Sequence, residues 1–507
     1  MVKFGKEHLL IFSVFVISTC GLVYELVAGA LASYLLGDSV KQFSFIIGTY
    51  LFSMGVGSYF SKFLTKNSLK TFVEVELLVG LIGGMSATIL FLLFEYVSFF
   101  QGILYLFVVL TGVLVGLEIP LLMNLLKEKF KFKDLVSNVF TFDYIGSLLA
   151  SILFPLVLVP YLGLMRTSLF FGMINTCIGL LIVFRLRNEL NTYKFIMARG
   201  IFVFSLLLIT FIFANQLLRI SEGKLYGEDI VYTHSTSYQR IVLTHNKSEY
   251  RLYLNNNLQF SSKDEYRYHE ALVHPAMSMA KSIDSVLVLG GGDGLAAREI
   301  LKYPDVKNIT LVDLDGNMTR LFSTNTVMRS FNQNALYSPK LTIVNQDAFL
   351  WLREQKKLKY NVVIIDFPDP SNYSLGKLFS LGFYETLQHV LLPETIVTVQ
   401  TTSPYFAPKS FWCVNKTMQA VFNSVDAYHV YVPSFGEWGF SIACKSAIMD
   451  WNRVNRKVDG LKFYNYDYSK LNTFSEDMKV NMDKIEVNRL DNQSLVKYFD
   501  EEWGKIQ

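Results

Sequence analysis

The sequence predicts a multi-pass α-helical membrane domain followed by a soluble α/β domain. The mostly parallel, Rossmann-like sheet of the soluble domain is preceded by a small β-rich subdomain. Three observations predict this architecture. The 507 residues are 51% hydrophobic and include 42 Phe, and the apolar excess lies before about residue 220. Beyond that point strand-like and helix-like segments alternate. Residues 286–315 follow the order strand, glycine turn, helix, strand and acid, which opens a nucleotide-binding sheet.

Seven apolar stretches near the start of the chain are the predicted membrane spans. Most of them reach the ~20 residues that a helix needs to cross a ~30 Å hydrocarbon layer. The first is too long for a cleaved signal peptide and is followed by others, so we interpret it as an anchor. We therefore expect a multi-pass protein of the cell membrane, with the lipid bilayer as a partner. The stretches cover residues 9–34, 43–61, 72–94, 102–126, 139–162, 164–184 and 200–218.

The basic residues of the loops indicate an orientation for these spans. They gather before the first span and after the second, fourth and sixth, while the alternate loops carry little beyond Lys41 and Arg166. The positive-inside rule then places the N-terminus in the cytoplasm. An odd number of spans would put the second half of the chain outside, away from any nucleoside made in the cytosol, so the side of the membrane stays open. The residues used are Lys3, Lys6, Lys62, Lys66, Lys70, Lys127, Lys129, Lys131, Lys133, Arg185, Arg187, Lys194 and Arg199.

Five acidic residues lie within or near the spans, where a charge costs about 2.5–3.5 kcal/mol on insertion scales. Glu74 and Glu76 are expected near an interface, whereas Glu25, Glu118 and Asp143 are placed for an internal polar cluster. Such a cluster either binds a cation or makes hydrogen bonds between helices.

Changes in composition and pattern divide the chain into four segments. We expect a transmembrane domain of about seven helices at 1–220, a small β-rich subdomain at 221–282, a Rossmann-like domain at 283–450 and a polar tail at 451–507. No chemistry is predicted from the tail.

Within the small subdomain, alternating residues predict strands at 230–233, 239–244 and 250–254. Asn255, Asn256 and Asn257 predict a turn, because asparagine tolerates the left-handed conformation. Asp264 or an adjacent serine is expected to cap the following helix. The Rossmann-like sheet, which starts at residue 286, should then continue with strands at 341–345, 361–366 and 395–399. Its helices are expected at 347–356, 378–391 and 409–424, and a closing hairpin at 427–444.

The glycine turn at Gly290-Gly291-Gly292-Asp293-Gly294 predicts a nucleoside site. Its glycines let the backbone approach a ligand closely and leave N–H groups free at a helix start. The acid after the second strand, Asp313, can accept hydrogen bonds from two ribose hydroxyls. Asp293 would oppose a phosphate and suits a positively charged ligand such as an S-adenosyl sulfonium compound.

Four consecutive strands end in a carboxylate: Asp293, Asp313, Asp347 and Asp366. Ligands of open parallel sheets bind at the carboxyl ends of the strands, so these acids should share one site. Any one of them could be a helix cap, and Asp347 is the first candidate for that role. An acidic site beside a nucleoside favours a cationic second ligand, such as a di- or polyamine.

The soluble half resembles the polyamine aminopropyltransferases, or spermidine synthases. The membrane half looks like the N-terminal spans of a subset of that family, with the weaker motifs GLEIPL (116–121) and DYIGSLLASILFP (143–155). The motifs that carry the main resemblance are TSYQRIVL (236–243), LYLNNNLQFSSKDEYRYHEALVHP (252–275), VLVLGGGDGLAAREIL (286–301), LVDLD (311–315), NQDAF (345–349), VVIIDFPDP (362–370) and GEWGF (436–440).

The resemblance implies a reaction and its substrates. Decarboxylated S-adenosylmethionine, a co-substrate, donates its aminopropyl group to putrescine or a related amine. Spermidine and 5'-methylthioadenosine are the products. The resemblance implies no prosthetic group and no metal.

The resemblance also implies a role for each matching residue. Asp366 is expected to accept the proton of the amine. Substrate binding is expected at His269, Tyr268, Asp293, Asp369 and Gln400, with a helix-face packing role as the alternative for His269. Nucleoside binding is expected at Gln239, Gly290, Gly292, Asp293, Asp313, Asp347 and Ala348.

Some positions depart from the family pattern. Asn256-Asn257 replaces an Asp-Gly turn, Leu295 replaces a glycine, and Pro433 stands where a tyrosine often touches the amine. The donor end therefore looks intact and the acceptor end less so. Agmatine, cadaverine, propanediamine or spermidine could replace putrescine.

Two other functions stay open. An S-adenosylmethionine-dependent methyltransferase would share the glycine turn and the ribose acid, although Asp293 and the pair Asp366 and Asp369 argue against it. A non-catalytic polyamine-sensing or transport protein would depend on the acids in the spans.

A net charge of only +4 argues against a nucleic-acid partner, and four dispersed cysteines argue against a disulfide framework or zinc site. The oligomeric state stays open, a homo-oligomer included.

Overall fold

The computed structural model describes residues 6–504 except 37–38, 65–66, 95, 98, 128, 237, 356 and 446–453. It forms two compact units, Met1–Gln239 and Arg240–Gln507, which are described in turn. Lys3 and Lys66, used for the orientation, and the predicted boundary at residue 450 lie outside the described residues.

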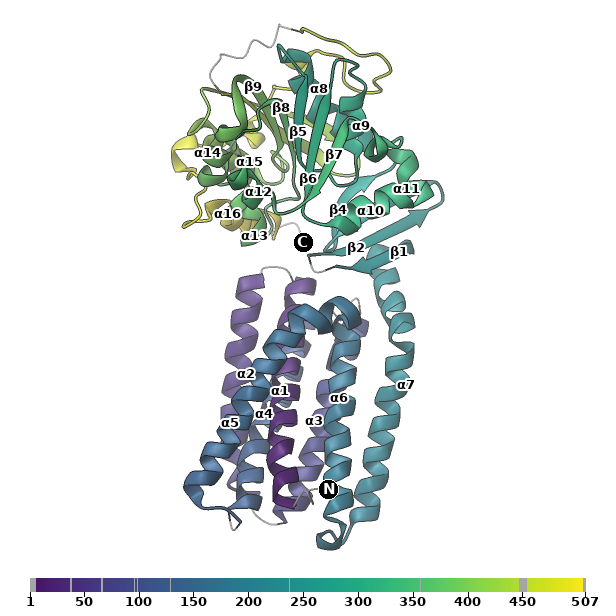
Figure 1. Ribbon diagram of the computed structural model, residues 1–507, viewed down its shortest axis with the longest axis vertical. Coiled ribbons are helices and arrows are strands. Elements are labelled where there is room, and N and C mark those ends of the chain that lie inside the picture. The colour runs from purple at the N-terminus through teal and green to yellow at the C-terminus, as the bar shows by residue number, and fades with distance from the viewer. Residues whose placement is uncertain are drawn as a thin grey trace. The chain divides into compact units, whose positions relative to one another are not determined.

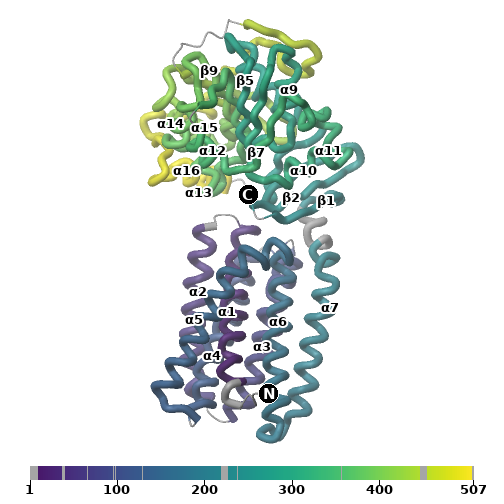
Figure 2. The backbone as a smooth tube through the Cα atoms, in the orientation of Figure 1, coloured from purple at the N-terminus to yellow at the C-terminus, as the bar shows by residue number. Residues whose placement is uncertain are grey.

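The first unit is a bundle of long apolar helices that run side by side (Figures 1 and 2). Its apolar core includes Val23, Phe72, Leu104 and Leu169, each 0% exposed. After the bundle comes the short strand β1 (Asp229–Ser235). The helices are α1 (Lys6–Leu36), α2 (Ser39–Ser61), α3 (Ser68–Leu93), α4 (Phe100–Leu126), α5 (Phe132–Leu153), α6 (Val159–Arg185) and α7 (Tyr193–Tyr226).

In the described part of the chain, six helical stretches are long and apolar enough to cross a membrane, against seven predicted spans. The difference lies in Phe132–Arg185, which is one continuous stretch of 54 residues. The sequence predicts two spans there, 139–162 and 164–184, separated by Gly163. A straight helix of that length would measure about 80 Å, more than twice the hydrocarbon layer. Gly163 has non-helical angles (φ 74°, ψ 172°), and α1 packs against both α5 and α6. The stretch therefore folds back on itself (Figure 1).

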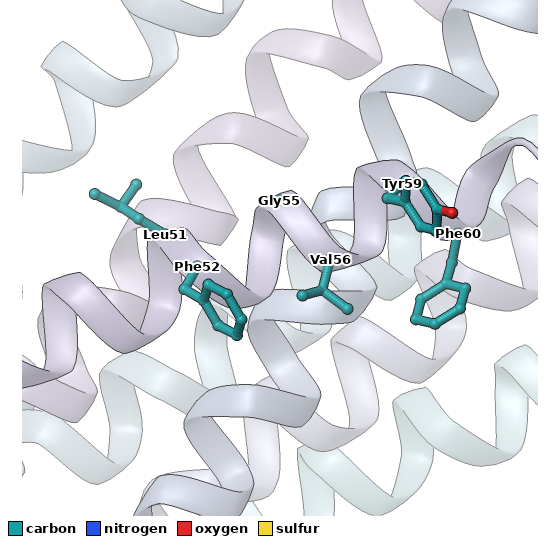
Figure 3. A pocket seen from close by; sticks show the side chains of 6 residues that line it. All are labelled: Leu51, Phe52, Gly55, Val56, Tyr59 and Phe60. Carbon is teal, nitrogen blue, oxygen red and sulfur yellow. The ribbon is translucent and has the colours of Figure 1, made fainter.

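The outer surface of the bundle is apolar. Phe52 on α2 is 73% exposed, Phe202 on α7 is 68% exposed and Tyr161 is 81% exposed. Figure 3 shows a hollow on α2 in which Phe52 and its helical neighbours stand out from the backbone. The lining residues are Leu51, Phe52, Gly55, Val56, Tyr59 and Phe60. A water-soluble surface rarely carries so many large apolar side chains.

The acids of the bundle fall into two kinds of environment. Glu74 is partly exposed and pairs with Arg199 at 3.3 Å. Glu76 is 0% exposed, because it faces α6 across Gly179. Its expected place near an interface stays a prediction. Glu118 is 1% exposed, and the carboxyl oxygens of both buried glutamates have no hydrogen-bond partner among the described residues.

The other two acids of the predicted polar cluster are placed differently. Glu25 is buried. The carboxylate of Asp143 accepts a hydrogen bond from the Ser18 hydroxyl, so this acid links α5 to α1. Whether any of these acids binds a cation stays a prediction.

The second unit begins with the antiparallel strands β2 (Arg240–Asn246), β3 (Glu249–Leu254) and β4 (Asn257–Ser261). Asn255 and Asn256 form the predicted turn, with φ of 49° and 68°. Strand β4 was not predicted, because it directly follows this turn and is short. Asp264 precedes α8, but its side chain does not cap that helix. It accepts hydrogen bonds from the backbone N–H and the hydroxyl of Ser434 instead.

The main sheet has seven strands in the order β10-β11-β9-β8-β5-β6-β7. Its centre consists of apolar strands such as β5, where Val286 to Leu289 are 0% exposed. The five strands from β5 to β9 run parallel, and a hairpin adds two antiparallel strands at one edge. The strands are β5 (Ser285–Gly290), β6 (Asn308–Asp313), β7 (Leu341–Asn345), β8 (Tyr360–Asp366), β9 (Leu391–Gln400), β10 (Ser424–Val432) and β11 (Gly436–Cys444). This confirms the predicted Rossmann-like sheet.

Helices flank this sheet (Figure 1). The predicted helix at 378–391 is shorter than expected, because β9 begins at Leu391. The described part of the tail contributes one α-helix and three short 3-10 helices, Tyr468–Lys470, Glu476–Met478 and Met482–Lys484. The helices are α8 (Glu265–Met279), α9 (Leu295–Leu301), α10 (Gly316–Thr324), α11 (Thr326–Phe331), α12 (Ala348–Glu354), α13 (Tyr373–Gly376), α14 (Leu381–Leu387), α15 (Pro408–Gln419) and α16 (Ser494–Trp503).

Candidate active site

The strand register brings the predicted carboxylates to one edge of the sheet. Gly290 at the end of β5 pairs with Asp366 at the end of β8, and Asp313 at the end of β6 pairs with Asn345 at the end of β7. Because parallel strands end together, the loops after all four strands meet at this edge, where ligands of such sheets bind.

The glycine turn packs tightly against both neighbouring strand ends. Gly290, Gly291 and Gly294 have φ of 83°, 66° and 77°, which glycine adopts without strain. A Cβ on Gly290 would lie 2.1 Å from the Asp366 carbonyl oxygen. A Cβ on Gly292 would lie 2.7 Å from the Asp313 carboxylate. Any side chain at either position would displace an acidic strand end.

Backbone N–H groups hold the carboxylates of Asp313 and Asp293. Asp313 accepts hydrogen bonds from Gly292 at 3.0 Å and Asp315 at 2.9 Å. Asp293 accepts one from Leu295 at 2.9 Å. Burial raises the pKa of Asp313 to about 6, although these N–H groups lower it. Burial also raises the pKa of Asp293 to about 6, against the opposing charge of His269. Each carboxylate keeps lone pairs for a ligand.

Asp366 is fixed by the phenol of Tyr268. The Tyr268 hydroxyl donates to Asp366 Oδ1 at 2.6 Å. The centroid of its ring lies 5.4 Å from the ring centroid of Phe440 on β11. Burial raises the pKa of Asp366, although the charge of His269 and the hydrogen bond from Tyr268 lower it. Burial and the negative charge of Asp366 raise the pKa of Tyr268 well above its usual range, so the phenol remains a donor.

Asp369 lies three residues further on and has a looser set of partners. Gln400 Nε2 donates to its Oδ1 at 3.4 Å, and the Thr402 hydroxyl donates to its Oδ2 at 3.4 Å. Burial raises the pKa of Asp369 to about 7, although both hydrogen bonds lower it. Gln400 is itself held through its bond to the Phe367 carbonyl oxygen at 2.6 Å. These long contacts leave accepting capacity on Asp369.

His269 is a buried imidazole paired with a carboxylate. Its Nδ1 bonds Glu265 Oε2 at 2.9 Å, and it is 2% exposed. Burial alone would lower the pKa of His269, but the hydrogen bond and charge of Glu265, with the charges of Asp293 and Asp366, raise it to about 9. His269 lies beside Asp293 and Asp366, and its Nδ1 is also 2.8 Å from the Glu265 carbonyl oxygen. Whether it binds substrate or only packs on the helix face stays a prediction.

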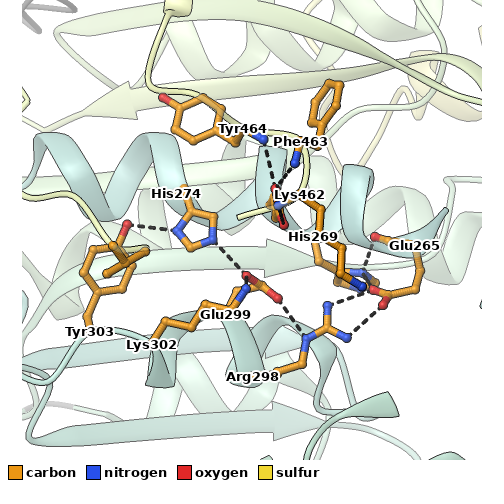
Figure 4. Close-up of polar contacts among 12 residues, drawn as sticks. Glu265, His269, His274, Arg298, Glu299, Lys302, Tyr303, Lys462, Phe463 and Tyr464 are labelled. Carbon is orange, nitrogen blue, oxygen red and sulfur yellow. Dashed lines mark hydrogen bonds and ion pairs between the residues drawn. The ribbon is translucent and has the colours of Figure 1, made fainter. Parts of the chain in front are cut away.

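A chain of buried ion pairs supports His269 (Figure 4). Arg298 donates to both oxygens of Glu265 at 2.8 and 2.9 Å, and its Nε donates to Glu299 at 2.8 Å. Glu299 also contacts His274 Nε2 at 2.9 Å. Burial would raise the pKa of Glu265, but His269 and Arg298 hold it at about 2. Bidentate pairing of this kind fixes both partners in orientation.

His269, Asp293 and Asp366 each offer one ligand atom, and these atoms lie within 4.8 Å of one another. The spacing alone would suit a metal ion. His269 must lose its proton before it can ligate a metal, and its raised pKa makes this loss less favourable. The set as it stands suits an organic cation better, and the prediction of no metal stays a prediction.

The side chain of Asp347 caps a helix, which is the alternative role that the sequence predicted for it. Its Oδ1 accepts hydrogen bonds from Phe349 and Leu350 at the start of α12, and its Oδ2 pairs with Lys377 at 2.7 Å. Burial would raise the pKa of Asp347, but the Lys377 ammonium and the cap hydrogen bonds lower it. The adenine-edge role of Asp347 and of its buried neighbour Ala348 stays a prediction.

Gln239 is the last residue of the first compact unit. Its backbone carbonyl accepts a hydrogen bond from the Thr236 hydroxyl at 3.1 Å, and its nucleoside contact stays a prediction. Ser237, in the motif that suggested it, lies outside the described residues.

Three residues of the site were not predicted from the sequence: Glu265, Arg298 and Thr402. Glu265 and His269 are four residues apart on α8, which is the spacing of facing side chains on a helix. That signal could have found Glu265. No local pattern marks Arg298 or Thr402, because the partners that tie them to the site, Glu265 and Asp369, each lie 33 positions away.

Comparisons with known proteins extend this picture. Residues 265–457 match the spermine/spermidine synthase domain. The chain is 49% identical to the polyamine aminopropyltransferase of Leptospira interrogans, over 97% of this chain and 98% of the relative. It is 50% identical to polyamine aminopropyltransferase 2 of Ralstonia nicotianae, over 98% of each chain, and 39% identical to polyamine aminopropyltransferase 1 of Streptomyces coelicolor, over 98% of this chain and 95% of the relative.

A solved spermidine synthase in complex with the transition state analogue AdoDATO aligns with 46% of this chain and 82% of its own, at 26% identity and a TM-score of 0.43. The curated relatives, by contrast, match along nearly the entire sequence, the apolar helices included. With that similarity and the spermine/spermidine synthase domain, the chain belongs to the polyamine aminopropyltransferases and is an enzyme of aminopropyl transfer.

Proposed function

We propose that the enzyme transfers the aminopropyl group of decarboxylated S-adenosylmethionine to putrescine or a related diamine. The products are spermidine, or its homologue, and 5'-methylthioadenosine. The observation that carries the proposal is the grouping of Asp293, Asp366 and Asp369 at one edge of the sheet, each with a raised pKa. Buried carboxylates that crowd together favour positively charged ligands, and both substrates are cations.

On this proposal the glycine turn and Asp313 hold the nucleoside. Gly290 and Gly292 leave no room for side chains, so the ligand can contact the backbone directly. Asp313 would accept the ribose hydroxyls, and Asp293 would bind the donor's primary ammonium. Asp293 also supports the choice of donor, because it would repel the carboxylate of intact S-adenosylmethionine.

Asp366 would act as the base. The acceptor ammonium gives one proton to Asp366, and the neutral nitrogen attacks the methylene beside the sulfonium. The new C–N bond forms as the C–S bond breaks, and the electron pair of the C–S bond stays on the sulfur and neutralises it. The raised pKa of Asp366 brings the carboxylate closer to the pKa of its proton donor. Tyr268 holds one oxygen of Asp366 in place, and Asp369 with Gln400 would hold the far end of the amine.

Product identification tests this function. The purified full-length enzyme would be given decarboxylated S-adenosylmethionine with a labelled aminopropyl group and a panel of diamines, and the products would be identified by mass spectrometry. We expect labelled spermidine from putrescine and none when intact S-adenosylmethionine is the donor. A methylated product from the intact donor would show a methyltransferase and remove the proposal.

We also propose that the first unit is integral to a lipid bilayer, with residues 132–185 crossing it twice. The apolar stretches and the exposed large side chains on α2 and α7 support this. The enzyme should remain in membranes washed at high pH and require detergent for release. Its presence in the alkaline wash would contradict the proposal. The side that carries the sheet, and any homo-oligomer, remain open.

A further inference from the structure

The C-terminal helix α16 lies beyond the part of the chain that matches the spermine/spermidine synthase domain, which ends at residue 457. It packs against α15. The carboxylate of Glu502 accepts hydrogen bonds from the backbone N–H groups of Lys409 at 2.8 Å and Ser410 at 3.0 Å. These N–H groups lie in the first turn of α15 and have no partner within that helix. Glu502 therefore anchors the end of α16 at a fixed place.

The next residue, Trp503, reaches toward the acceptor end of the site. Its indole Nε1 donates to the Thr402 hydroxyl oxygen at 3.3 Å. Its ring is packed between aromatic neighbours, with centroid distances of 5.7 Å to Phe406 and 5.9 Å to Phe499. Packing against these two rings restricts the orientation of the indole.

Thr402 has a backbone conformation that a β-branched residue rarely adopts. Its φ is 64°, and it is 0% exposed. Hydrogen bonds with Gly439 and Gln400 hold it there: its carbonyl accepts from the Gly439 N–H at 2.8 Å, and its own N–H donates to Gln400 Oε1 at 3.1 Å. Strain of this kind persists where surrounding contacts enforce it, and it is common at ligand sites.

The Thr402 hydroxyl has one hydrogen, and the indole determines its direction. Trp503 can only donate, so it occupies a lone pair on the hydroxyl oxygen and leaves the hydrogen for Asp369 Oδ2 at 3.4 Å. Donation thus runs in one direction, from Trp503 through Thr402 to Asp369. The Thr402 hydrogen is thus directed at the Asp369 carboxylate, whose remaining lone pairs stay available.

We propose that Trp503 is a positioning residue for the acceptor amine, and that it acts through Thr402 on the carboxylate that binds the amine's distal ammonium. This inference rests on the proposed role of Asp369. It assigns part of the acceptor site to the C-terminal tail, outside the matched domain. The ligand class is a diamine with a second ammonium group beyond the reacting nitrogen.

The test compares Trp503→Phe with Trp412→Phe in the full-length enzyme. Both changes remove one indole N–H and keep a ring, since Trp412 Nε1 donates to the Met478 carbonyl at 2.7 Å within the tail contacts. We expect Trp503→Phe to raise the KM for a diamine roughly threefold to tenfold. The kcat and the donor KM should change less than about twofold. Trp412→Phe should leave all three parameters unchanged.

Three further variants and one substrate complete the test. Thr402→Val should raise the diamine KM at least as much, and the double variant should be no worse than Thr402→Val alone. A monoamine acceptor, which lacks the distal ammonium, should have the same KM in wild type and Trp503→Phe. Equal effects on diamine and monoamine, or a changed donor KM, would overturn the inference. If Asp369→Asn leaves the diamine KM unchanged, the proposed role of Asp369 fails; if it raises the KM while Trp503→Phe does not, only the role of Trp503 fails.

Discussion

The ionisation of Asp369 should control how tightly the enzyme binds its acceptor near neutral pH. Burial raises the pKa of this carboxyl to about 7, against the lowering effect of Gln400 and Thr402. Only the ionised form attracts an ammonium group. A group of pKa 7 is about 90% ionised at pH 8 and about 10% at pH 6, whereas a primary amine remains charged throughout this range.

The expected magnitude follows from these fractions. The dissociation constant of the diamine should rise about tenfold from pH 8 to pH 6, with the midpoint near pH 7. Isothermal titration of the detergent-solubilised, donor-free enzyme measures it directly. Asp369→Asn should bind weakly at pH 8 and lose the pH dependence. Asp366→Asn should keep a midpoint near pH 7, because burial is the largest cause of the raised pKa of Asp369.

The donor provides an internal comparison. Its ammonium is proposed to bind Asp293, whose pKa burial raises to about 6, so donor affinity should fall at lower pH than diamine affinity. A diamine dissociation constant that is constant from pH 6 to pH 8 would refute the reasoning. So would a midpoint that persists in Asp369→Asn.

Three other changes test the site. Asp366→Asn should reduce kcat by a factor of about 10²–10⁴ while the dissociation constant of methylthioadenosine stays within twofold of the wild-type value. Turnover at the wild-type rate would show that Asp366 is not the base. Glu265→Gln should destabilise the enzyme by about 3–5 kcal/mol, because it leaves the buried Arg298 without its bidentate partner. Because the pKa of His269 is raised to about 9, its contribution to stability is complete below about pH 6.5 and is lost as pH rises through 9; melting temperatures should show this loss in the wild type and not in the variant. Gly290→Ala should abolish nucleoside binding, since its Cβ would meet the Asp366 carbonyl at 2.1 Å, whereas Gly55→Ala on α2, with open space around the new Cβ, should bind normally.

Much of the architecture is determined by the sequence itself. The apolar stretches predict the helices of the first unit because length and hydrophobicity are local properties. The order strand, glycine turn, helix, strand and acid predicts the sheet, and with it the shared edge where Asp293, Asp313 and Asp366 meet. Parallel strands must end together, so residues at their ends become neighbours whatever the side-chain packing.

The tertiary structure decided which side chains pair at that edge. Asp347 ends a strand like the others, yet it caps α12 and binds Lys377. Tyr268 bonds Asp366 across 98 positions of the chain, and Trp503 bonds Thr402 across 101. Such pairings depend on how α8, α16 and the loop after β9 pack, and no periodic pattern encodes that packing. The break at Gly163 is similar, because glycine permits a turn but only the neighbouring helices decide that the chain turns there.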